Sequence, residues 1–269
     1  MMTRSASNRE VWASGEGYES YVGRWSRLVA RDFVRWLDVA PGSAWLDVGC
    51  GTGALIDAIL EGAAPGSVSG IDRSEGYVAH ARGRIADGRV ELRTGDAQAV
   101  PFEDGAFDAA VSGLVLNFVP DEEAMAREMA RVVRHGGVVA CYVWDYADKM
   151  ELMRHFWDAA VELNPAASSL DEGQRFTICD PGRLEALFRT SGLRSVESKA
   201  IDVPTDFVDF DDYWTPFLMG DAPAPGYCTS LDEAARARLR DRVRSRLPIR
   251  ADGSIHLIAR AWAVKGVVP

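Results

Sequence analysis

The stretch from Trp45 to Gly53 reads WLDVGCGTG, and it turns an apolar run into a glycine-rich segment directly before a helical pattern. Glycine at three alternate positions, Gly49, Gly51 and Gly53, permits left-handed dihedrals and lets a small molecule approach the main chain closely. Asp47 stands at the end of the expected strand. The spacing Gly-x-Gly-x-Gly differs from the Gly-x-Gly-x-x-Gly pattern that is typical of dinucleotide sites. The stretch therefore predicts a strand, turn and helix that hold a cofactor other than a nicotinamide.

Strand and helix signals alternate along the first half of the chain. Strands are expected near 44–48, 68–72, 90–94, 107–112 and 137–143. Such alternation is typical of a mostly parallel sheet with helices on both faces, and ligands bind at the carboxyl ends of its strands. The residues expected at those ends are Gly49, Asp72, Asp96 and Ser112. Topology thus predicts that they share one site.

Two carboxylates in this set carry specific expectations. Asp72 lies 19 positions after Gly53, close to the interval of roughly 20 residues expected for an acid that binds ribose hydroxyls. The alternative is a helix cap for the segment that starts near Ser74. Asp96 follows the third expected strand, and its alternative is a plain turn residue after Gly95.

Four short motifs occur in order along the chain. They are the glycine turn, Gly70-Ile71-Asp72, Gly95-Asp96-Ala97 with the segment 101–108 (PFEDGAFD), and the segment 131–137 (RVVRHGG). In this order they resemble the class I S-adenosylmethionine (AdoMet)-dependent methyltransferases, especially the small-molecule enzymes related to ubiquinone and menaquinone methyltransferases. The resemblance implies a Rossmann-like, doubly wound α/β fold. Its seven-stranded sheet would be mostly parallel, with the last strand antiparallel and helical cap insertions.

The resemblance also implies the cofactor and its contacts. AdoMet would bind and leave as S-adenosylhomocysteine (AdoHcy), with its methionine part on the turn Gly49 to Gly53. Asp72 would hold the ribose hydroxyls and Asp96 the adenine amino group. The further candidates for cofactor contact are Asp47, Arg73, Ala97 and Ser112.

The chain divides into a helical cap at 1–40, a cofactor-binding core at 41–145, and a remainder at 146–269 that belongs to the same domain. Within the remainder, helices are expected from Met150 to Leu163 and from Asp180 to Thr190, and strands near 195–201 and 255–264. By resemblance the two strands complete the sheet. The segments 146–180 and 206–247 would then be insertions that form a lid.

The N-terminal cap supplies four candidates from the segment 18–26 (YESYVGRWS). A sulfonium favours an aromatic surround and a carboxylate favours a cation, so Tyr18 and Arg24 are predicted cofactor contacts. Tyr21 and Trp25 are candidates for the substrate. The alternative is that the aromatic residues fix the following helix in place while Arg24 pairs with a surface acid.

The acceptor pocket is expected at the lid and at the segment after the fourth strand. Asn117, Phe118 and Trp214 are the candidates, Trp214 as part of an aromatic run from Phe207 to Phe217. Insertions at this edge of an α/β sheet commonly wall a pocket. Aromatic residues at helical spacing are, in the alternative, ordinary core.

A catalytic base is not identified. The segment 112–120 (SGLVLNFVP) has no His or Asp, lacks the Asn-Pro-Pro-Tyr signature of amino-directed nucleic-acid methyltransferases, and offers only the Asn117 amide, which can orient a substrate. His155 and His256 are possible bases, with structural roles as the alternative. Alignment alone lowers a barrier by roughly 7–11 kcal/mol in favourable cases, so a base is optional.

Composition excludes several classes of partner. The net charge is −10, and the arginines of 236–246 are interleaved with acids, so neither nucleic acid nor an anionic membrane is expected. The four cysteines are scattered without Cys-x-x-Cys or zinc spacing, so no metal is expected. The chain shows no membrane-spanning run and no signal-peptide core, which predicts a cytoplasmic protein.

The sequence thus predicts an AdoMet-dependent methyltransferase. Its acceptor would be a small, apolar or aromatic molecule methylated at oxygen, nitrogen or carbon. Two alternatives stand beside it: a nicotinamide-dependent oxidoreductase on a related fold, and an inactive AdoMet-binding partner protein.

Overall fold

Seven strands form one mixed sheet in the order β3-β2-β1-β4-β5-β7-β6. The computed structural model describes residues 23–219 and 222–269. The strands are β1 (Ala44–Val48), β2 (Ser67–Asp72), β3 (Val90–Thr94), β4 (Phe107–Gly113), β5 (Val133–Trp144), β6 (Arg194–Phe207) and β7 (Ile255–Val267). The first five are parallel, and β7 runs antiparallel to both β5 and β6. The expected α/β sheet with an antiparallel last strand is confirmed.

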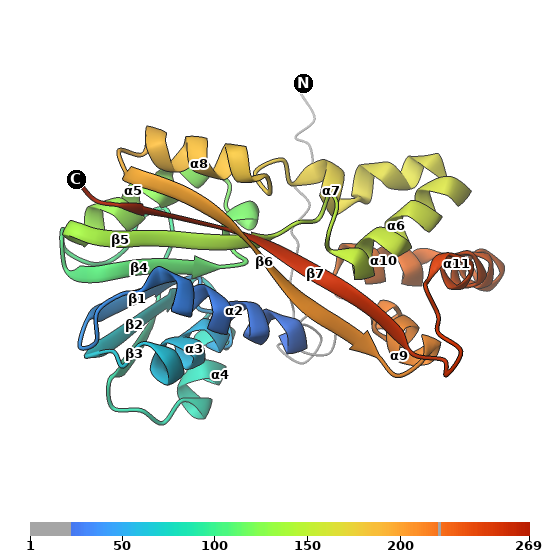
Figure 1. Cartoon of the computed structure of the whole chain (residues 1–269), viewed down its shortest axis with the longest axis horizontal. Helices are drawn as coiled ribbons and strands as arrows, with labels where there is room; N and C mark the ends of the chain where they lie inside the picture. Colours follow the sequence, from blue (N-terminus) through green and yellow to red (C-terminus); the bar gives the residue numbers. More distant parts are fainter. Residues whose placement is uncertain (1–22, 220–221) are drawn as a thin grey trace, which may run out of the picture.

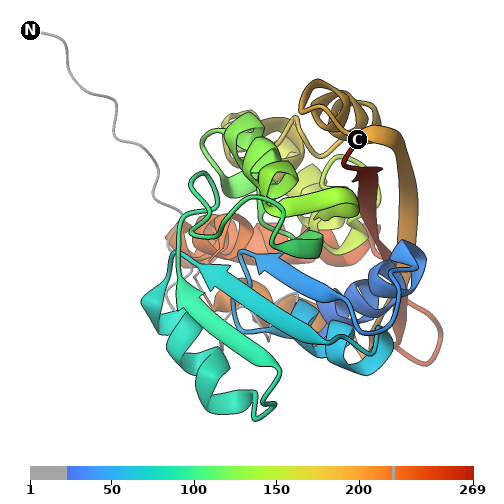
Figure 2. The same ribbon diagram turned by 90° about the vertical axis from the view of Figure 1, so that its left-hand side faces the viewer.

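Helices cover both faces of this sheet. On one side α2 (Arg24–Leu37) packs on α3 (Ala54–Gly62), and α4 (Glu75–Arg84) contacts β2 and β3. On the other side α5 (Glu122–Val132) packs against α8 (Pro181–Thr190). Figure 2 shows α2 and α3, in blue and cyan, across the sheet from α5 and α8, in green and gold. Because the central strands are covered twice, β1 is buried along nearly its whole length, Asp47 included.

The remaining helices gather at one end of the sheet, beyond the carboxyl ends of β4 and β5 (Figure 1). They are η2 (Leu116–Phe118), α6 (Glu151–Leu163), η3 (Pro165–Leu170), α7 (Glu172–Arg175), α9 (Phe210–Trp214), η4 (Thr215–Leu218), α10 (Pro223–Ser230) and α11 (Glu233–Arg246). We call the segment from α6 to α7 and the segment from α9 to α11 the lid. The lid places side chains of distant segments over the edge of the sheet at which the glycine turn lies.

The last two strands extend beyond the expected ranges, to Phe207 and Val267. Val203, Thr205 and Phe207 are buried while their neighbours are exposed, so this part of β6 follows the period of two of a strand with one covered face. The intervening Asp202, Pro204 and Asp206 obscure that pattern in the sequence. The second lid segment therefore begins after Phe207, slightly later than expected.

The lid has an aromatic core of its own. Phe156 of α6 stacks on Phe217 with ring centroids 4.5 Å apart, and Tyr213 donates its hydroxyl hydrogen to the Leu152 carbonyl at 2.7 Å. Trp214 packs between Phe210 and Phe217 and is 5% exposed. Because these rings fill the space between helices, most of the aromatic run from Phe207 to Phe217 packs the lid, as the alternative held.

Candidate cofactor and acceptor site

A cavity of about 600 Å³ lies at the carboxyl edge of the sheet, under the lid. One end is lined by the glycine turn and the ends of β2 and β3, and the other by η2, α6, α7 and the start of α10. The residues that line it include Ser26, Asp47, Gly49, Gly51, Asp72, Arg73, Asp96, Ala97, Asn117, Phe118, Tyr146, Met153, Glu172, Arg175, Phe176, Ala222 and Pro223. The edge that topology predicted is therefore hollow, and most predicted contacts meet there.

The glycine turn is held by β2 and has the backbone shape that only glycine adopts easily. The amides of Gly49 and Cys50 donate to the Ile71 carbonyl at 2.8 and 2.9 Å. Gly51 has φ +50°, and a Cβ built there meets nothing within 4 Å although the residue lines the cavity. A side chain at Gly51 would therefore enter the space open to a ligand.

The other two glycines of the motif are closely packed against neighbouring side chains, and of these two only Gly49 also lines the cavity. A Cβ at Gly49 would lie 2.5 Å from a methyl carbon of Val115, and φ there is +79°. Gly53 is the N-cap of α3, lies outside the cavity lining, and leaves room for Ile85 and Arg84. The structure thus separates three glycines that the sequence presents as one set.

Asp72 ends β2 and faces the cavity. Its carboxylate accepts hydrogen bonds from the amides of Gly51, at 3.0 Å, and Ser74, at 2.8 Å. Ser74 itself caps α4 by accepting from the Tyr77 amide. A carboxylate has about four acceptor positions, so two remain for vicinal hydroxyls. Ser74 is therefore the N-cap of α4, and the ribose-binding role of Asp72 stays a prediction.

Asp96 lies beside Arg73 and Ala97 at the same end of the cavity. Its Oδ1 accepts from the Gln98 amide at 2.9 Å and from the Gln98 side chain at 3.1 Å. These hydrogen bonds and the nearby Arg73 charge lower the pKa of Asp96. Asp96 is thus a turn residue that also lines the cavity, and its contact with adenine stays a prediction.

Asp47 is the most unusual group in the cavity. Its carboxylate is 1% exposed, and within the described part of the chain neither oxygen has a hydrogen-bond partner. Burial, together with the charge of Asp72, raises the pKa of Asp47 to about 8. An unpartnered buried carboxylate costs free energy that a bound cation or hydrogen-bond donor recovers. The amino group of a ligand's methionine part fits this requirement.

Besides Gly53, three predicted cofactor contacts lie away from the cavity or outside the described residues. Ser112 is buried and donates to the Val48 carbonyl at 2.7 Å, which ties β4 to β1 instead of facing the cavity. Arg24 pairs with Asp212 at 3.3 Å and stacks over Trp25 and Phe207, outside the lining. Tyr18, like the substrate candidate Tyr21, lies outside the described residues. These placements favour the structural alternative for Arg24 and point to a structural role for Ser112.

Two of the substrate candidates stand at the acceptor end and two do not. Asn117 and Phe118 line the cavity, whereas Trp25 is packed edge-on against Phe207 and Trp214 lies in the aromatic core of the lid. Both polar atoms of the Asn117 amide are buried without a hydrogen-bond partner among the described residues. Like the Asp47 carboxylate, this amide is a buried polar group of the cavity wall without a hydrogen-bond partner among the described residues, and its contact with a substrate stays a prediction.

Three aromatic side chains contact one another in a row along the cavity wall. Phe118 meets Phe176 edge-on at 5.1 Å between centroids, and Phe176 lies 5.4 Å from Tyr146. These rings come from η2, from the end of β5 and from beyond α7, so they meet only in the folded chain. The acceptor end is therefore largely apolar and aromatic.

Glu172 and Arg175 of α7 add charge to this wall, and sequence analysis missed both. Glu172 is 3% exposed and accepts a hydrogen bond from the indole nitrogen of Trp157. In the sequence they belong to a polar stretch, DEGQR, with no periodicity that marks a buried side. Only the anchoring of this stretch against α6 turns Glu172 inward.

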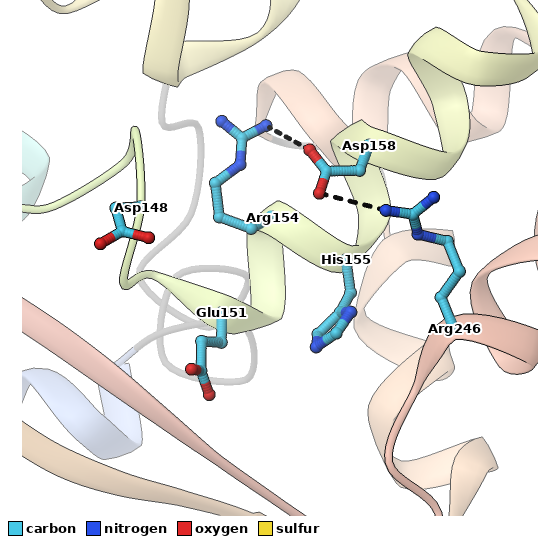
Figure 3. Close-up of a pocket in the computed structure, with 6 residues that line it drawn as sticks. All are labelled: Asp148, Glu151, Arg154, His155, Asp158 and Arg246. Carbon is cyan, nitrogen blue, oxygen red and sulfur yellow. Dashed lines mark hydrogen bonds and ion pairs between the residues drawn. The ribbon is translucent and has the colours of Figure 1, made fainter.

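Neither histidine considered as a base reaches the cavity. His155 lines a separate pocket of about 420 Å³ with Asp148, Glu151, Arg154, Asp158 and Arg246. In Figure 3 Asp158 bridges Arg154 and Arg246, and burial lowers the pKa of His155. His256 pairs with Asp206 at 2.7 Å and lies 3.2 Å from the Ser254 hydroxyl at the exposed end of β7.

The described residues also bear on binding of metal ions and on crossing of a membrane. Across 23–219 and 222–269, no group of three or more His, Cys, Asp or Glu side chains is placed to bind a metal ion. In the same ranges, no helix combines the length and apolar character needed to cross a bilayer.

Comparison with known proteins identifies the class. Residues 46–141 match the family model described as a methyltransferase domain. A demethylmenaquinone methyltransferase of Halalkalibacterium halodurans is 33% identical over 183 residues, which cover 63% of this chain and 75% of that protein. One of Bacillus cytotoxicus is 42% identical over 115 residues, which cover 41% of this chain and 48% of that protein. The chain spans about half the length of several of these relatives.

A solved structure agrees in fold. The phosphoethanolamine N-methyltransferase 2 of Haemonchus contortus, in complex with S-adenosyl-L-methionine, superposes with a TM-score of 0.60 at 17% identity, over 94% of this chain and 56% of that one. The chain belongs to the family of S-adenosylmethionine-dependent methyltransferases. This confirms the expected family and its cofactor, AdoMet, while the methyl acceptor is a matter for proposal.

Proposed function

We propose that this protein transfers the methyl group of AdoMet to a small, largely apolar or aromatic molecule, at an oxygen, nitrogen or carbon atom. One observation carries the proposal: a single cavity contains the Asp47 carboxylate, which has no hydrogen-bond partner among the described residues, the open face of Gly51 and the acid Asp72, and it continues into an aromatic lid. The first three suit an amino acid moiety joined to a ribose. The lid suits an acceptor held next to them.

Each end of the cofactor has residues that fit it. Asp47 would face the methionine ammonium, Gly49 and Gly51 would lie against the methionine chain, and Asp72 would accept from the ribose hydroxyls. Asp96, Arg73 and Ala97 would surround the adenine. Bound AdoMet supplies a methyl group on a positively charged sulfur. The protein's own contribution is to align the acceptor with that methyl group and to exclude water.

The organisation of the chain supports the same proposal. Residues 41–145 would hold the cofactor, and 146–269 would complete the sheet and cover the acceptor within one domain, with 1–40 as a cap. In α11, Arg242 and Arg246 pair with Glu162 of α6 and Arg240 pairs with Asp241, so acids neutralise part of the positive charge of this helix. All four cysteines are free and buried, which supports a reducing, cytoplasmic location.

Calorimetric titration with AdoMet, AdoHcy and NADH tests the proposal. Binding of AdoMet and AdoHcy, with none of NADH, is expected because the site fits a methionine ammonium and one ribose. No binding of AdoHcy at millimolar concentration contradicts the proposal, and binding of NADH alone favours the oxidoreductase alternative. Sustained AdoHcy release with a defined acceptor excludes an inactive partner protein.

A further inference from the structure

Three residues of the cavity wall carry buried polar atoms that have no hydrogen-bond partner within the described part of the chain. They are Asp47, Asn117 and Trp144. Native proteins rarely leave such groups unpaired, because each costs free energy until a ligand or a water completes it. Under the proposed function the cofactor ammonium completes Asp47. The Asn117 amide and the Trp144 indole nitrogen still require an account.

Asn117 and Trp144 lie away from the proposed cofactor end. The sheet order begins β3-β2-β1-β4-β5, and the glycine turn and the two acids follow β1, β2 and β3. Asn117 belongs to η2, which follows β4 and contacts β5, and Trp144 is the last residue of β5. Phe118 and Tyr146, close to them in sequence, belong to the aromatic row of the wall. The two unpaired side chains thus belong to the part of the wall expected to meet the methyl acceptor.

The backbone that carries these two side chains is fixed. The Leu114 amide donates to the Tyr142 carbonyl of β5 at 2.8 Å, and Leu114 has φ +62°, which a residue other than glycine adopts at a cost. Leu116, beside Asn117, is 2% exposed and anchors η2 in the core. Trp144 is 1% exposed, on a strand that pairs with β4 on one side and β7 on the other. A partner must therefore fit these groups where they stand.

The unpaired atoms define the chemical group that completes them. An indole N–H can only donate, whereas a primary amide donates through its nitrogen and accepts through its oxygen. A carbonyl oxygen has two lone pairs, so it can accept from the indole of Trp144 and from the amide nitrogen of Asn117. An N–H or O–H beside that carbonyl then donates to the Asn117 oxygen. A hydrocarbon leaves all three groups unpaired.

We propose that Asn117 and Trp144 recognise a methyl acceptor that carries a carbonyl oxygen with a neighbouring N–H or O–H on an aromatic framework, as in an aryl carboxamide or a lactam. This inference rests on the proposed function and narrows its acceptor. The two side chains bind and orient the acceptor, and neither receives a proton or a methyl group.

Three probes of nearly the same shape test this complementarity. 2-Naphthamide offers a carbonyl oxygen and an N–H, 2-acetylnaphthalene offers only the oxygen, and 2-isopropylnaphthalene offers neither. Equilibrium dialysis of each probe against the full chain saturated with AdoHcy measures its affinity. Partition of each probe between octanol and water corrects for its own hydrophobicity. After this correction we expect the carboxamide to bind most tightly and the hydrocarbon least, with about tenfold between successive probes.

Variants assign the individual contacts. Trp144→Phe removes the indole N–H, so the affinity ratio of ketone to hydrocarbon should fall about tenfold while the ratio of carboxamide to ketone is kept. Asn117→Leu removes both polar atoms of the amide, so both ratios should fall.

Trp45→Phe is the matched control. The Trp45 indole nitrogen is also buried without a partner among the described residues, but Trp45 does not line the cavity. This variant should keep both ratios, and all three variants should bind AdoHcy as the unaltered protein does.

The outcomes separate the two proposals. If AdoHcy does not bind the unaltered protein, the proposed function fails and this inference fails with it. Three results overturn the inference and leave the proposed function standing: AdoHcy binds but no probe does, the hydrocarbon binds best after correction, or Trp144→Phe changes the ratios no more than Trp45→Phe. The ranking in the unaltered protein decides even where a variant does not fold.

Discussion

The backbone N–H of Gly51 donates to Oδ2 of Asp72 at 3.0 Å, so the glycine turn after β1 and the acid that ends β2 hold each other in place. The other carboxylate oxygen accepts from the Ser74 amide at 2.8 Å. The group proposed to hold the ribose therefore also shapes the turn proposed to hold the methionine part. A change at Asp72 acts on both.

Asp72→Ala is expected to lower AdoHcy affinity about 10- to 100-fold, since a charged hydrogen bond to a ligand hydroxyl contributes roughly 1.5–3 kcal/mol. Two backbone amides lose their acceptor, so the free energy of unfolding should also fall, by about 1–2 kcal/mol. Calorimetry and urea denaturation measure the two effects. Asp104→Ala, at an exposed acid, is the control. Normal affinity in a folded variant would assign Asp72 to the turn alone.

Asp47 predicts how stability depends on pH. In the ligand-free protein, burial raises the pKa of Asp47 from its ordinary value of 3.8 to about 8, so the folded state keeps a proton that the unfolded state loses. The Asp47 contribution to the free energy of unfolding should therefore fall between about pH 4 and pH 8, by at most ~1.4 kcal/mol per pH unit. Below and above this window it should be flat.

Asp47→Asn should remove this slope and stabilise the ligand-free protein at pH 8 by a few kcal/mol. AdoHcy affinity should fall at least tenfold because the ammonium loses its counter-charge. Titrations in buffers of different ionisation enthalpy should show proton release on binding to the unaltered protein at pH 7, and none with Asp47→Asn. Equal proton release in both proteins would place the ammonium elsewhere.

Gly51→Ala tests the shape of the cavity. A methyl group there meets no protein atom within 4 Å and points into space proposed for the cofactor. Gly42→Ala is the matched control, because Gly42 also has a positive φ and open surroundings but does not line the cavity. Both variants should lose roughly 1 kcal/mol of stability to backbone strain. Only Gly51→Ala should lose AdoHcy affinity, by tenfold or more, and equal affinities would refute this placement.

Asn117→Leu separates stability from ligand recognition. The buried amide has no hydrogen-bond partner among the described residues, so an apolar side chain of similar size should raise the free energy of unfolding by about 1 kcal/mol. Binding of an aromatic acceptor analogue such as 2-naphthol to the AdoHcy complex should weaken if Asn117 contacts the acceptor. The affinity for AdoHcy itself should change little. Thermal denaturation and calorimetry give the two readouts. A destabilised variant with unchanged affinity for 2-naphthol would show that the amide serves the fold.

Much of the cofactor end could be predicted from sequence because its residues are local to their motifs. Gly51, Asp72 and Asp96 follow strands whose carboxyl ends must meet in a parallel sheet, so spacing and topology place them together. Asp47 was also predicted by position. Its isolation from every hydrogen-bond partner in the described chain, and hence its pKa, required the packing of β1 between its neighbours.

The sequence by itself determined the α/β sheet, the position of the glycine turn and the acids at the strand ends, since these depend on periodicity and turn chemistry over short ranges. Tertiary structure alone decided that Ser112 bonds to β1, that Trp214 fills the lid core, and that Glu172 faces the cavity. Each of these depends on contacts between segments far apart in the chain, and burial of a single side chain leaves no periodic trace in a short, irregular segment. The acceptor wall is made of such segments.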